Sequence, residues 1–485
     1  MTSDSPAPTR AAVTIPVKVG YGAGQLVEGV GSAAFSSFLF FFYVGLLGLP
    51  GSLVGAAAAI SLAVDAVVDP LLGSWSDNIR SRFGRRVPFM VVGGPIVALA
   101  VGLIFSPPRG LGAWPLFAWL LSGSLLLRIS TSVFNVPFSA LGAEVSDDYA
   151  ERSSVAAYRT VFSILGALAV LILGYGVFLA GSDGLRHIQG YAPMAWSAAA
   201  LIALGAFVSV LAIHRFAARL PVASQSAVSL RRRLPRETLE MFRNPSFRVL
   251  FACTVFFYVG QGVAGALFQH MHLLVWGLTS AQIFQVLLTY FAGLMAATPF
   301  APVLTRTIEK RTLLICGLIM LCLAQGGLSG LRALHVITLS GAAVVGPLCA
   351  GAFLAGLGVT VASVSIISMM ADAADEHDFL FGARREGLYF AGLSFAGKTA
   401  TGLGTLIAGI AVDLIGFPTN LATVGTAMKI TPERLDALAW VAGPLVALIS
   451  GTGLLILMLY RIDRRRHVQV SDALTARRME AFADA

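Results

Sequence analysis

Apolar residues in this chain come in long blocks, and polar residues gather in the shorter stretches between them. Twelve apolar segments can be traced, most of about 18–25 residues, which is the length that crosses a bilayer as an α-helix. They lie near residues 20–46, 51–75, 88–106, 112–140, 154–181, 192–217, 247–276, 282–306, 311–330, 337–370, 386–416 and 434–462. The pattern predicts an all-α integral membrane protein with twelve transmembrane helices.

A basic polar stretch between the sixth and seventh segments divides the helices into two sets of six. Charged loops recur at matching places, because RSRFGRR follows the second segment and RTIEKR follows the eighth. Such positional agreement is typical of a duplicated transporter. The predicted parts are an N-terminal tail, a six-helix half, a central loop, a second six-helix half and a C-terminal tail, at residues 1–18, 19–217, 218–246, 247–462 and 463–485.

The composition and the motifs argue against a soluble protein and against an enzyme. Only 12% of the residues are charged and 56% are hydrophobic, whereas a soluble protein carries about 25% charged residues. The sequence contains no Walker phosphate-binding loop. Its glycine-rich turns open or lie inside apolar segments, where glycine favours close helix packing. We therefore expect a protein that is not an enzyme and that has no cofactor.

The net charge of +9 comes from basic residues that gather in particular loops. They follow the second and eighth segments and fill the central loop and the C-terminal tail. Basic residues in short loops mark the cytoplasmic side, so both termini and the central loop are predicted to be cytoplasmic. Membrane orientation explains the basic excess without nucleic acid. We expect a monomer in contact with lipid in the cytoplasmic (inner) membrane.

Two carboxylates interrupt the second apolar segment. Asp65 lies near mid-depth, and Asp69 follows one helical turn later on the same face. One charge at that depth costs at least ~2.5–3.5 kcal/mol on insertion scales, and intramembrane acids usually mark ion or proton pathways. The pair must share a proton, hold a cation such as Na⁺, or meet a positive side chain. The predicted role is a coupling-cation site, and the alternative is an ion pair that only locks helices together.

Other ionisable and polar side chains also lie at depth. Lys398 sits near the middle of the eleventh segment, where an isolated lysine loses its proton or seeks an acid. Its expected partners are the two carboxylates of the second segment, either as an internal cation that exchanges with the coupling ion or as a fixed strut. Glu28 is a third acid, with a water-facing position nearer the cytoplasm as the alternative. Ser132 and Asn135 share a face of the fourth segment, and Arg159 lies at the cytoplasmic mouth of the same half.

Charged residues at the cytoplasmic ends of the helices form a separate group. Ion pairs between the halves would close the inner side of the pore in one state and break in the other, because surface pairs contribute only ~0.2–1 kcal/mol each. Solvated loop charges are the alternative. The residues predicted to form this cytoplasmic gate are Arg85, Asp147, Glu151, Arg152, Asp372, Asp375, Asp378, Arg384, Arg385 and Glu386.

With these residues located, the chain resembles the glycoside–pentoside–hexuronide:cation symporters, the melibiose-carrier-like family of the major facilitator superfamily. The resemblance lies in DAVVDPLLGSWSDNIRSRFGRRVPF, NVPFSALGAEVSDDYAERSSVAAYR and MMADAADEHDFLFGARREGLYFAGLSFAGKTATGLG. It covers essentially the whole chain, in the same order and spacing. It implies the major facilitator fold and symport by alternating access.

The resemblance also implies roles for individual residues. Asp65 and Asp69 correspond to the carboxylates of the cation site. Ser132 stands where a threonine hydroxyl helps to bind the cation, Lys398 retains the lysine beside that site, and Arg159 keeps an arginine associated with sugar binding.

The chain departs from melibiose-type members at the sugar site. Their two sugar-binding carboxylates correspond to Gly29 and Asn135, and their sugar-stacking tryptophan corresponds to Ser139. Glu28 adjoins the missing acid but points about 100° away on a helix, so we do not expect it to be a simple substitute. Asn135 can still bond a hydroxyl, and Arg159 suits a substrate carboxylate.

The predicted function is secondary active transport, in which inward movement of Na⁺ or H⁺ drives uptake of a sugar, glycoside or uronide. The substrate is expected between the halves, near Glu28, Asn135, Arg159 and Lys398. One alternative is a cation-coupled transporter of a lysolipid or another amphipathic substrate. Another is a non-transporting sensor or scaffold on the same fold.

Overall fold

A computed structural model describes residues 14–79, 81, 84–144, 148–217, 238–383, 385–418, 421, 430–462 and 464–483. Within these residues, twelve helices are long and apolar enough to cross a membrane. Each coincides with one of the predicted segments, and the bounds differ by several residues at some ends. The described residues form helices and no strands, so the predicted all-α membrane architecture is confirmed.

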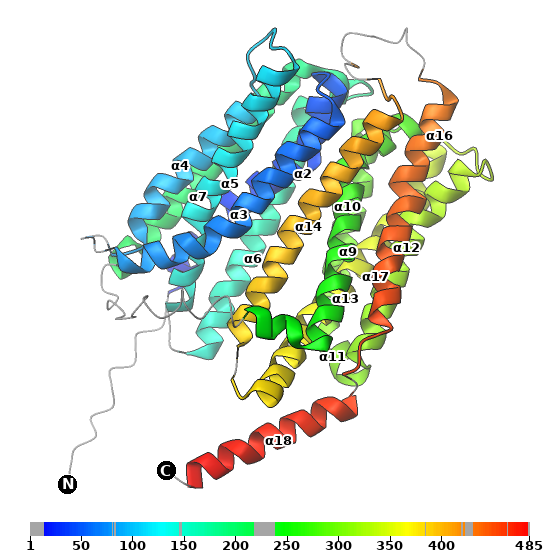
Figure 1. Cartoon of the computed structure of the whole chain (residues 1–485). Coiled ribbons are helices and arrows are strands. Elements are labelled where there is room, and N and C mark those ends of the chain that lie inside the picture. The colour runs from blue at the N-terminus through cyan, green and yellow to red at the C-terminus, as the bar shows by residue number, and fades with distance from the viewer. Residues whose placement is uncertain are drawn as a thin grey trace. The chain divides into compact units, whose positions relative to one another are not determined.

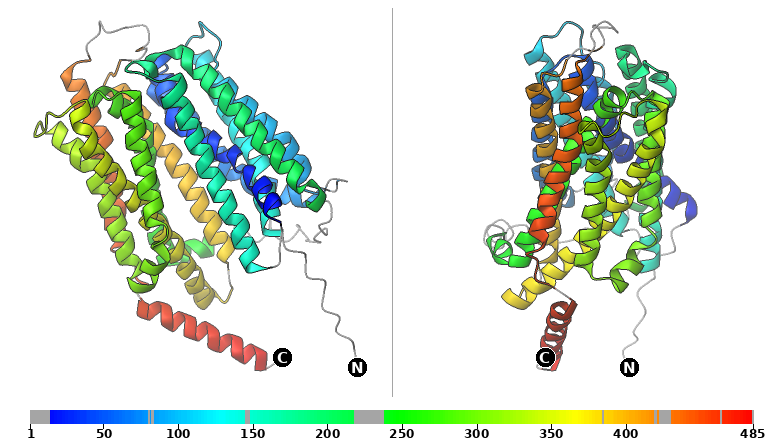
Figure 2. Two further views of the ribbon diagram at one scale, coloured as in Figure 1. Left: turned by 180° about the vertical axis from the view of Figure 1, so that it is seen from behind. Right: turned by 90° about the vertical axis from the view of Figure 1, so that its right-hand side faces the viewer.

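The chain folds as two compact units, which comprise Met1–Leu49 with Val64–Gln225, and Pro50–Ala63 with Ser226–Ala485. In each unit the long helices run side by side as a bundle (Figures 1 and 2). The first half of the second membrane helix groups with unit 2 and its second half with unit 1. The predicted halves at 19–217 and 247–462 did not anticipate this division of one helix.

Unit 1 is built from helices that pack against one another in pairs. Helix α4 lies against α5 and α7, and α2 lies against α6 and α7. The helices are α1 (Ile15–Ala23), α2 (Leu26–Phe41), α3 (Gly51–Asn78, shared with unit 2), α4 (Val87–Ile104), α5 (Ala113–Glu144), α6 (Tyr149–Leu171) and α7 (Tyr191–Ala217). Helix α3 continues through Pro70.

The first membrane span of unit 1 is interrupted. Helix α1 ends at Ala23 and α2 begins at Leu26, and a π-helical turn, η1 (Phe42–Leu46), completes the span. Gln25 lies in the break and is buried. Breaks in membrane helices are tolerated where they are enclosed by protein, and this one brings a buried amide side chain within reach of the neighbouring helices.

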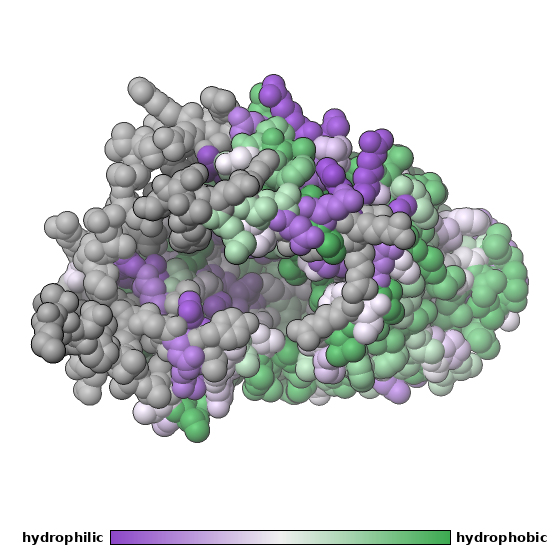
Figure 3. Space-filling view, turned by 90° about the horizontal axis from the view of Figure 1, so that it is seen from below, coloured by the Kyte–Doolittle hydropathy of each residue, from purple (hydrophilic) through white to green (hydrophobic). Residues whose placement is uncertain are grey.

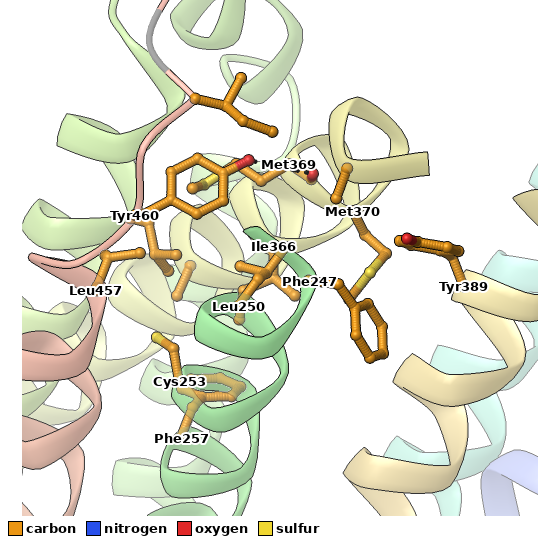
Figure 4. Close-up of a cluster of buried hydrophobic side chains, with 14 of the residues drawn as sticks. Phe247, Leu250, Cys253, Phe257, Ile366, Met369, Met370, Tyr389, Leu457 and Tyr460 are labelled. Carbon is orange, nitrogen blue, oxygen red and sulfur yellow. Dashed lines mark hydrogen bonds between the residues drawn. The ribbon is translucent and has the colours of Figure 1, made fainter. Parts of the chain in front are cut away.

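Unit 2 packs α12 against α13, α9 against α14, and α10 against α13. Its core, drawn in Figure 4, joins α9, α13 and α14 through side chains such as Phe247, Met370 and Tyr389. The helices are α9 (Pro245–His270), α10 (Ser280–Ala297), α11 (Ala301–Thr307), α12 (Lys310–Ala333), α13 (Ala342–Phe381), α14 (Glu386–Leu414), α16 (Pro432–Trp440), α17 (Val446–Leu457) and α18 (Arg464–Ala483). The last, α18, occupies the predicted C-terminal tail.

The first half of α3 packs closely on α14 within unit 2. A Cβ added at Gly51 would lie 2.6 Å from the carbonyl oxygen of Gly409, so only glycine allows this approach. The carboxylate of Asp413 accepts hydrogen bonds from the backbone N–H groups of Gly51 (2.7 Å) and Ser52 (2.8 Å). A side chain of α14 thereby satisfies orphan donors at the start of α3.

Polar side chains are visible at one end of the molecule (Figure 3). Viewed from that end in Figure 3, hydrophilic side chains gather in several groups among apolar ones. This distribution agrees with helices whose middle parts are apolar and whose ends carry the charged loops.

Candidate functional site

Polar side chains on α2, α3, α5 and α6 come together in unit 1. On α5, residues 128, 132, 135 and 139 follow one another at spacings of four, three and four, so they share one face of the helix. The four side chains on this stripe are an arginine, a serine, an asparagine and a second serine. The contacts below show that the stripe faces the acids of α2 and α3.

The first contact joins the predicted cation-site carboxylate to a hydroxyl. Ser132 Oγ donates a hydrogen bond to Asp65 Oδ1 at 2.7 Å, and Asp65 is only 5% exposed. Asp69 lies one turn further along α3 and is partly buried. The structure therefore brings Ser132 on α5 to Asp65 on α3. Together the two side chains supply three oxygens to the expected cation site, two from the carboxylate and one from the hydroxyl.

The second contact joins Glu28 to Asn135. Asn135 Nδ2 donates to Glu28 Oε2 at 2.8 Å, and Gln25 Nε2 donates to the same oxygen at 2.6 Å. Because a carboxylate accepts only from the amide nitrogen, this bond fixes the orientation of the Asn135 amide. The other amide atom, Asn135 Oδ1, is buried and has no hydrogen-bond partner among the described residues.

Close packing explains why a glycine stands at the first family acid position. A Cβ added at Gly29 would lie 2.2 Å from the carbonyl oxygen of Ser163 on α6, so no side chain fits there. The neighbouring Glu28 is the acid that reaches α5. The helical-wheel argument set Glu28 about 100° away from the missing acid and did not anticipate its bond to Asn135.

Arg159 joins the same network from α6. Its Nε donates to Gln25 Oε1 at 3.2 Å and its Nη2 donates to Ser139 Oγ at 2.8 Å. The guanidinium also lies over the ring of Phe138, 4.9 Å from the centroid. Ser139 is a small side chain at the position where melibiose-type members carry a tryptophan. The guanidinium of Arg159 reaches Ser139.

The sequence analysis did not identify two members of the network, Gln25 and Arg128. Arg128 lies in the neighbourhood of Asp65, Glu28 and Asp69. Its guanidinium stacks over the Phe35 ring at 4.6 Å. The signal for Arg128 was available, because it precedes Ser132 by four residues on the same helix face. No comparable signal exists for Gln25, since its position depends on the helix break.

Lys398 lies on α14 in unit 2 and is partly buried. Its predicted partners belong to unit 1, so its pairing with Asp65 or Asp69 stays a prediction.

The structure places the described members of the predicted gate at or near helix ends. Arg85 pairs with Glu144, as does Arg86 at 2.9 Å. Glu151 pairs with Lys18 at 2.6 Å and Asp372 pairs with Lys310 at 2.7 Å. In each of these pairs both partners belong to one unit. The sequence analysis did not assign Lys18, Arg86, Glu144 or Lys310 to the gate.

The remaining gate residues lie partly inside and partly outside the described part of the chain. The residues Arg152, Asp375, Asp378, Arg385 and Glu386 are described, whereas Asp147 and Arg384 lie outside the described residues. Ion pairing across the halves stays a prediction.

Comparison with known proteins places this chain in a family. The chain matches the family model described as "MFS/sugar transport protein" over residues 20–464. It is 25% identical to the inner membrane symporter YicJ of Escherichia coli, with 82% of each chain covered. It is 23% identical to the isoprimeverose transporter of Lactiplantibacillus pentosus, with 90% of this chain and 86% of that one covered.

A third relative is the human sodium-dependent lysophosphatidylcholine symporter 1, at 27% identity over 87% of this chain and 78% of the relative. The family model spans nearly the whole sequence, with eleven of the twelve membrane helices in full and most of the first. The chain is therefore a member of the MFS/sugar transport protein family, in its glycoside–pentoside–hexuronide:cation symporter group, and it is a transporter and not an enzyme.

Proposed function

We propose that this transporter couples the entry of Na⁺ or H⁺ to the uptake of a sugar, glycoside or uronide. The observation that carries the proposal is the arrangement on α5. Ser132 bonds the buried Asp65 at 2.7 Å, and Asn135, three residues later on the same face, bonds Glu28 at 2.8 Å. A cation site and a hydroxyl-binding site thus share one helix face.

The cation step uses the carboxylates of Asp65 and Asp69. Carboxylate and hydroxyl oxygens are hard ligands that suit Na⁺, and the same carboxylates accept a proton. The Ser132 hydroxyl donates to Asp65 in the structure and has lone pairs for a cation when it rotates. Lys398 is proposed to act beside this pair, as the family resemblance implies.

The substrate step uses the open acceptor of Asn135. A buried carbonyl oxygen without a partner costs about 1–3 kcal/mol, and a sugar hydroxyl that donates to Asn135 Oδ1 would remove this cost. Glu28 Oε1 and Oε2 offer further acceptors. The guanidinium of Arg159 suits the carboxylate of a uronide, because arginine binds carboxylates with two parallel hydrogen bonds.

We further propose that the protein is a monomer of the cytoplasmic (inner) membrane, with both termini in the cytoplasm. Basic loops after the second and eighth helices support this orientation. Cation and substrate would bind from outside, and alternating access would release both inward. Protease accessibility of tagged termini in right-side-out and inverted vesicles tests the orientation.

Purified protein in proteoliposomes tests the proposed function. We expect counterflow of labelled substrate from a panel of glycosides, pentosides and hexuronides, and accumulation driven by an imposed Na⁺ or H⁺ gradient. Asp65→Asn and Asp69→Asn should each lose accumulation while the protein stays in the membrane. Asp183→Asn, in a loop where Asp183 pairs with Arg186 at 3.1 Å, is the matched control and should accumulate normally. Undiminished gradient-driven uptake by either test variant contradicts the proposal.

The lysophosphatidylcholine relative favours one second candidate, a lysolipid or other amphipathic substrate. The same proteoliposomes distinguish the two substrates. Inward movement of a fluorescent lysolipid without sugar counterflow supports the second candidate, and sugar counterflow without lysolipid movement supports the first.

A further inference from the structure

Gln25 is buried in the break between α1 and α2, and each end of its amide bonds a charged side chain. Its Nε2 donates to Glu28 Oε2 at 2.6 Å, and its Oε1 accepts from Arg159 Nε at 3.2 Å. An amide has one donor end and one acceptor end, so these two bonds fix its orientation. Gln25 is thus a neutral bridge between an anion on α2 and a cation on α6.

Close packing fixes the position of this bridge. A Cβ added at Gly24, the residue before Gln25, would lie 2.6 Å from the ring of Phe138 on α5 and 2.6 Å from Ser209 Oγ on α7. The guanidinium of Arg159 lies over the same Phe138 ring, 4.9 Å from its centroid. Both partners of the bond between Gln25 and Arg159 are therefore positioned by one aromatic side chain.

The bridge stands where the two charges could otherwise pair with each other. Glu28 and Arg159 are both described, and no ion pair or hydrogen bond joins them. Arginine and a carboxylate in contact frequently form two parallel hydrogen bonds, which would use both oxygens of Glu28. Instead, among the described residues, Glu28 accepts through Oε2 and Arg159 donates through Nε and Nη2. Glu28 Oε1 and Arg159 Nη1 remain for a ligand.

We propose that Gln25 is a positioning residue for the substrate, which holds Glu28 and Arg159 apart so that both charges bind the ligand and not each other. The inference rests on the proposed function, because it assigns these two charges to a sugar-like substrate. A polyhydroxylated ligand satisfies both, since a hydroxyl donates to a carboxylate and accepts from a guanidinium. Without the amide the two charges would meet, and the substrate would have to separate them before it could bind.

A stability cycle without substrate tests the separation of the two charges. Melting temperatures are compared for Glu28→Gln, Arg159→Gln and their double variant, in the wild-type protein and in Gln25→Ala. Alanine leaves space in which the two long side chains can meet. The double variant should therefore be destabilised less than the sum of the single ones, by a wider margin in Gln25→Ala than in the wild-type protein. An equal or narrower margin in Gln25→Ala refutes the separation. If Gln25→Ala does not fold, the isosteric variant Gln25→Glu decides.

Counterflow of Gln25→Glu tests the role of Gln25 in substrate binding. The new carboxyl group has the size of the amide, and it can replace both bonds only while it holds a proton to donate to Glu28. Two carboxylates in contact repel each other, so the pair shares one proton and loses it as the pH rises. The half-saturating substrate concentration, divided by that of the wild type at the same pH, should rise about tenfold from acidic to alkaline buffer, which corresponds to about 1.4 kcal/mol.

Gln282→Glu is the matched control. Gln282 Oε1 accepts from the backbone N–H of Thr279 at 2.9 Å in the capping box of α10, and glutamate serves equally well at that position. Its ratio to the wild type should not change with pH. A ratio for Gln25→Glu that does not rise with pH refutes the role of Gln25 in binding. Absence of sugar, glycoside or uronide counterflow by the wild type refutes the proposed function instead, and the stability cycle still decides the separation.

Discussion

The Asn135→Ala variant has separately measurable effects on substrate binding and on the stability of the protein. In Asn135→Ala the bond to Glu28 at 2.8 Å is lost, and so is the buried acceptor Oδ1. A hydrogen bond to a charged group contributes about 1.5–3 kcal/mol, and the remaining bond from Gln25 to Glu28 reduces the loss to the lower end of that range. We therefore expect a lower melting temperature in the absence of substrate.

The effect of Asn135→Ala on substrate binding differs in size from its effect on stability and is measured by counterflow. One neutral hydrogen bond to a substrate hydroxyl contributes about 0.5–1.5 kcal/mol, which corresponds to about a 2- to 13-fold rise in the half-saturating substrate concentration of counterflow. Counterflow is measured at several substrate concentrations in proteoliposomes that contain equal amounts of protein, so that a lower yield does not appear as weaker binding.

Asn244→Ala is the matched control. Asn244 caps helix α9 by accepting from the N–H groups of Ser246 (2.8 Å) and Phe247 (3.2 Å), and its amide donates to Ala373 O at 3.1 Å. Loss of a cap costs about 0.5–2 kcal/mol, so this variant should also melt earlier, with an unchanged half-saturating concentration. If Asn135→Ala likewise lowers only the melting temperature, Asn135 does not bind substrate and the substrate site proposed for unit 1 is wrong.

Three further outcomes are expected. Gly29→Ala should lower the melting temperature strongly, since its Cβ would lie 2.2 Å from Ser163 O and overpacking costs about 1–3 kcal/mol; normal melting would show that the two helices separate freely. Asp413→Ala removes the acceptor for two backbone N–H groups of α3 and should cost about 0.5–2 kcal/mol in a thermal melt, whereas Asp472→Ala, on α18, should not. Glu28→Gln exchanges charge-assisted bonds for neutral ones, which are roughly half as strong, so counterflow should need a few-fold more substrate; an unchanged concentration dependence would exclude a direct role for this charge.

The membrane architecture could be predicted from the sequence because it depends on segment length and hydropathy alone. Every predicted segment corresponds to a helix, since backbone groups in lipid leave the chain few alternatives. The pairing of Ser132 with Asp65 was within reach for a similar reason, because a polar residue buried in an apolar helix must turn toward another polar group. The ion pairs at the helix ends were not, because Glu144, Lys18 and Lys310 carry no spacing signal that distinguishes them from solvated charges.

The position of Glu28 shows why residue roles cannot be transferred from relatives by aligned position alone. Alignment assigns the acid to Gly29, and the helical wheel then sets Glu28 on another face. The side chain that reaches the site is decided by packing: Gly29 is in contact with the backbone of α6 at Ser163, and this contact fixes the rotation of α2. With α2 packed in this way, Glu28 accepts hydrogen bonds from Asn135 and Gln25.

The negative charge of the missing acid is thus present one residue earlier, at Glu28. The second acid of the family is replaced by Asn135, whose amide donates to Glu28. A pair of like charges has become a hydrogen-bonded pair with one net charge, which leaves Asn135 Oδ1 as an acceptor for a hydroxyl.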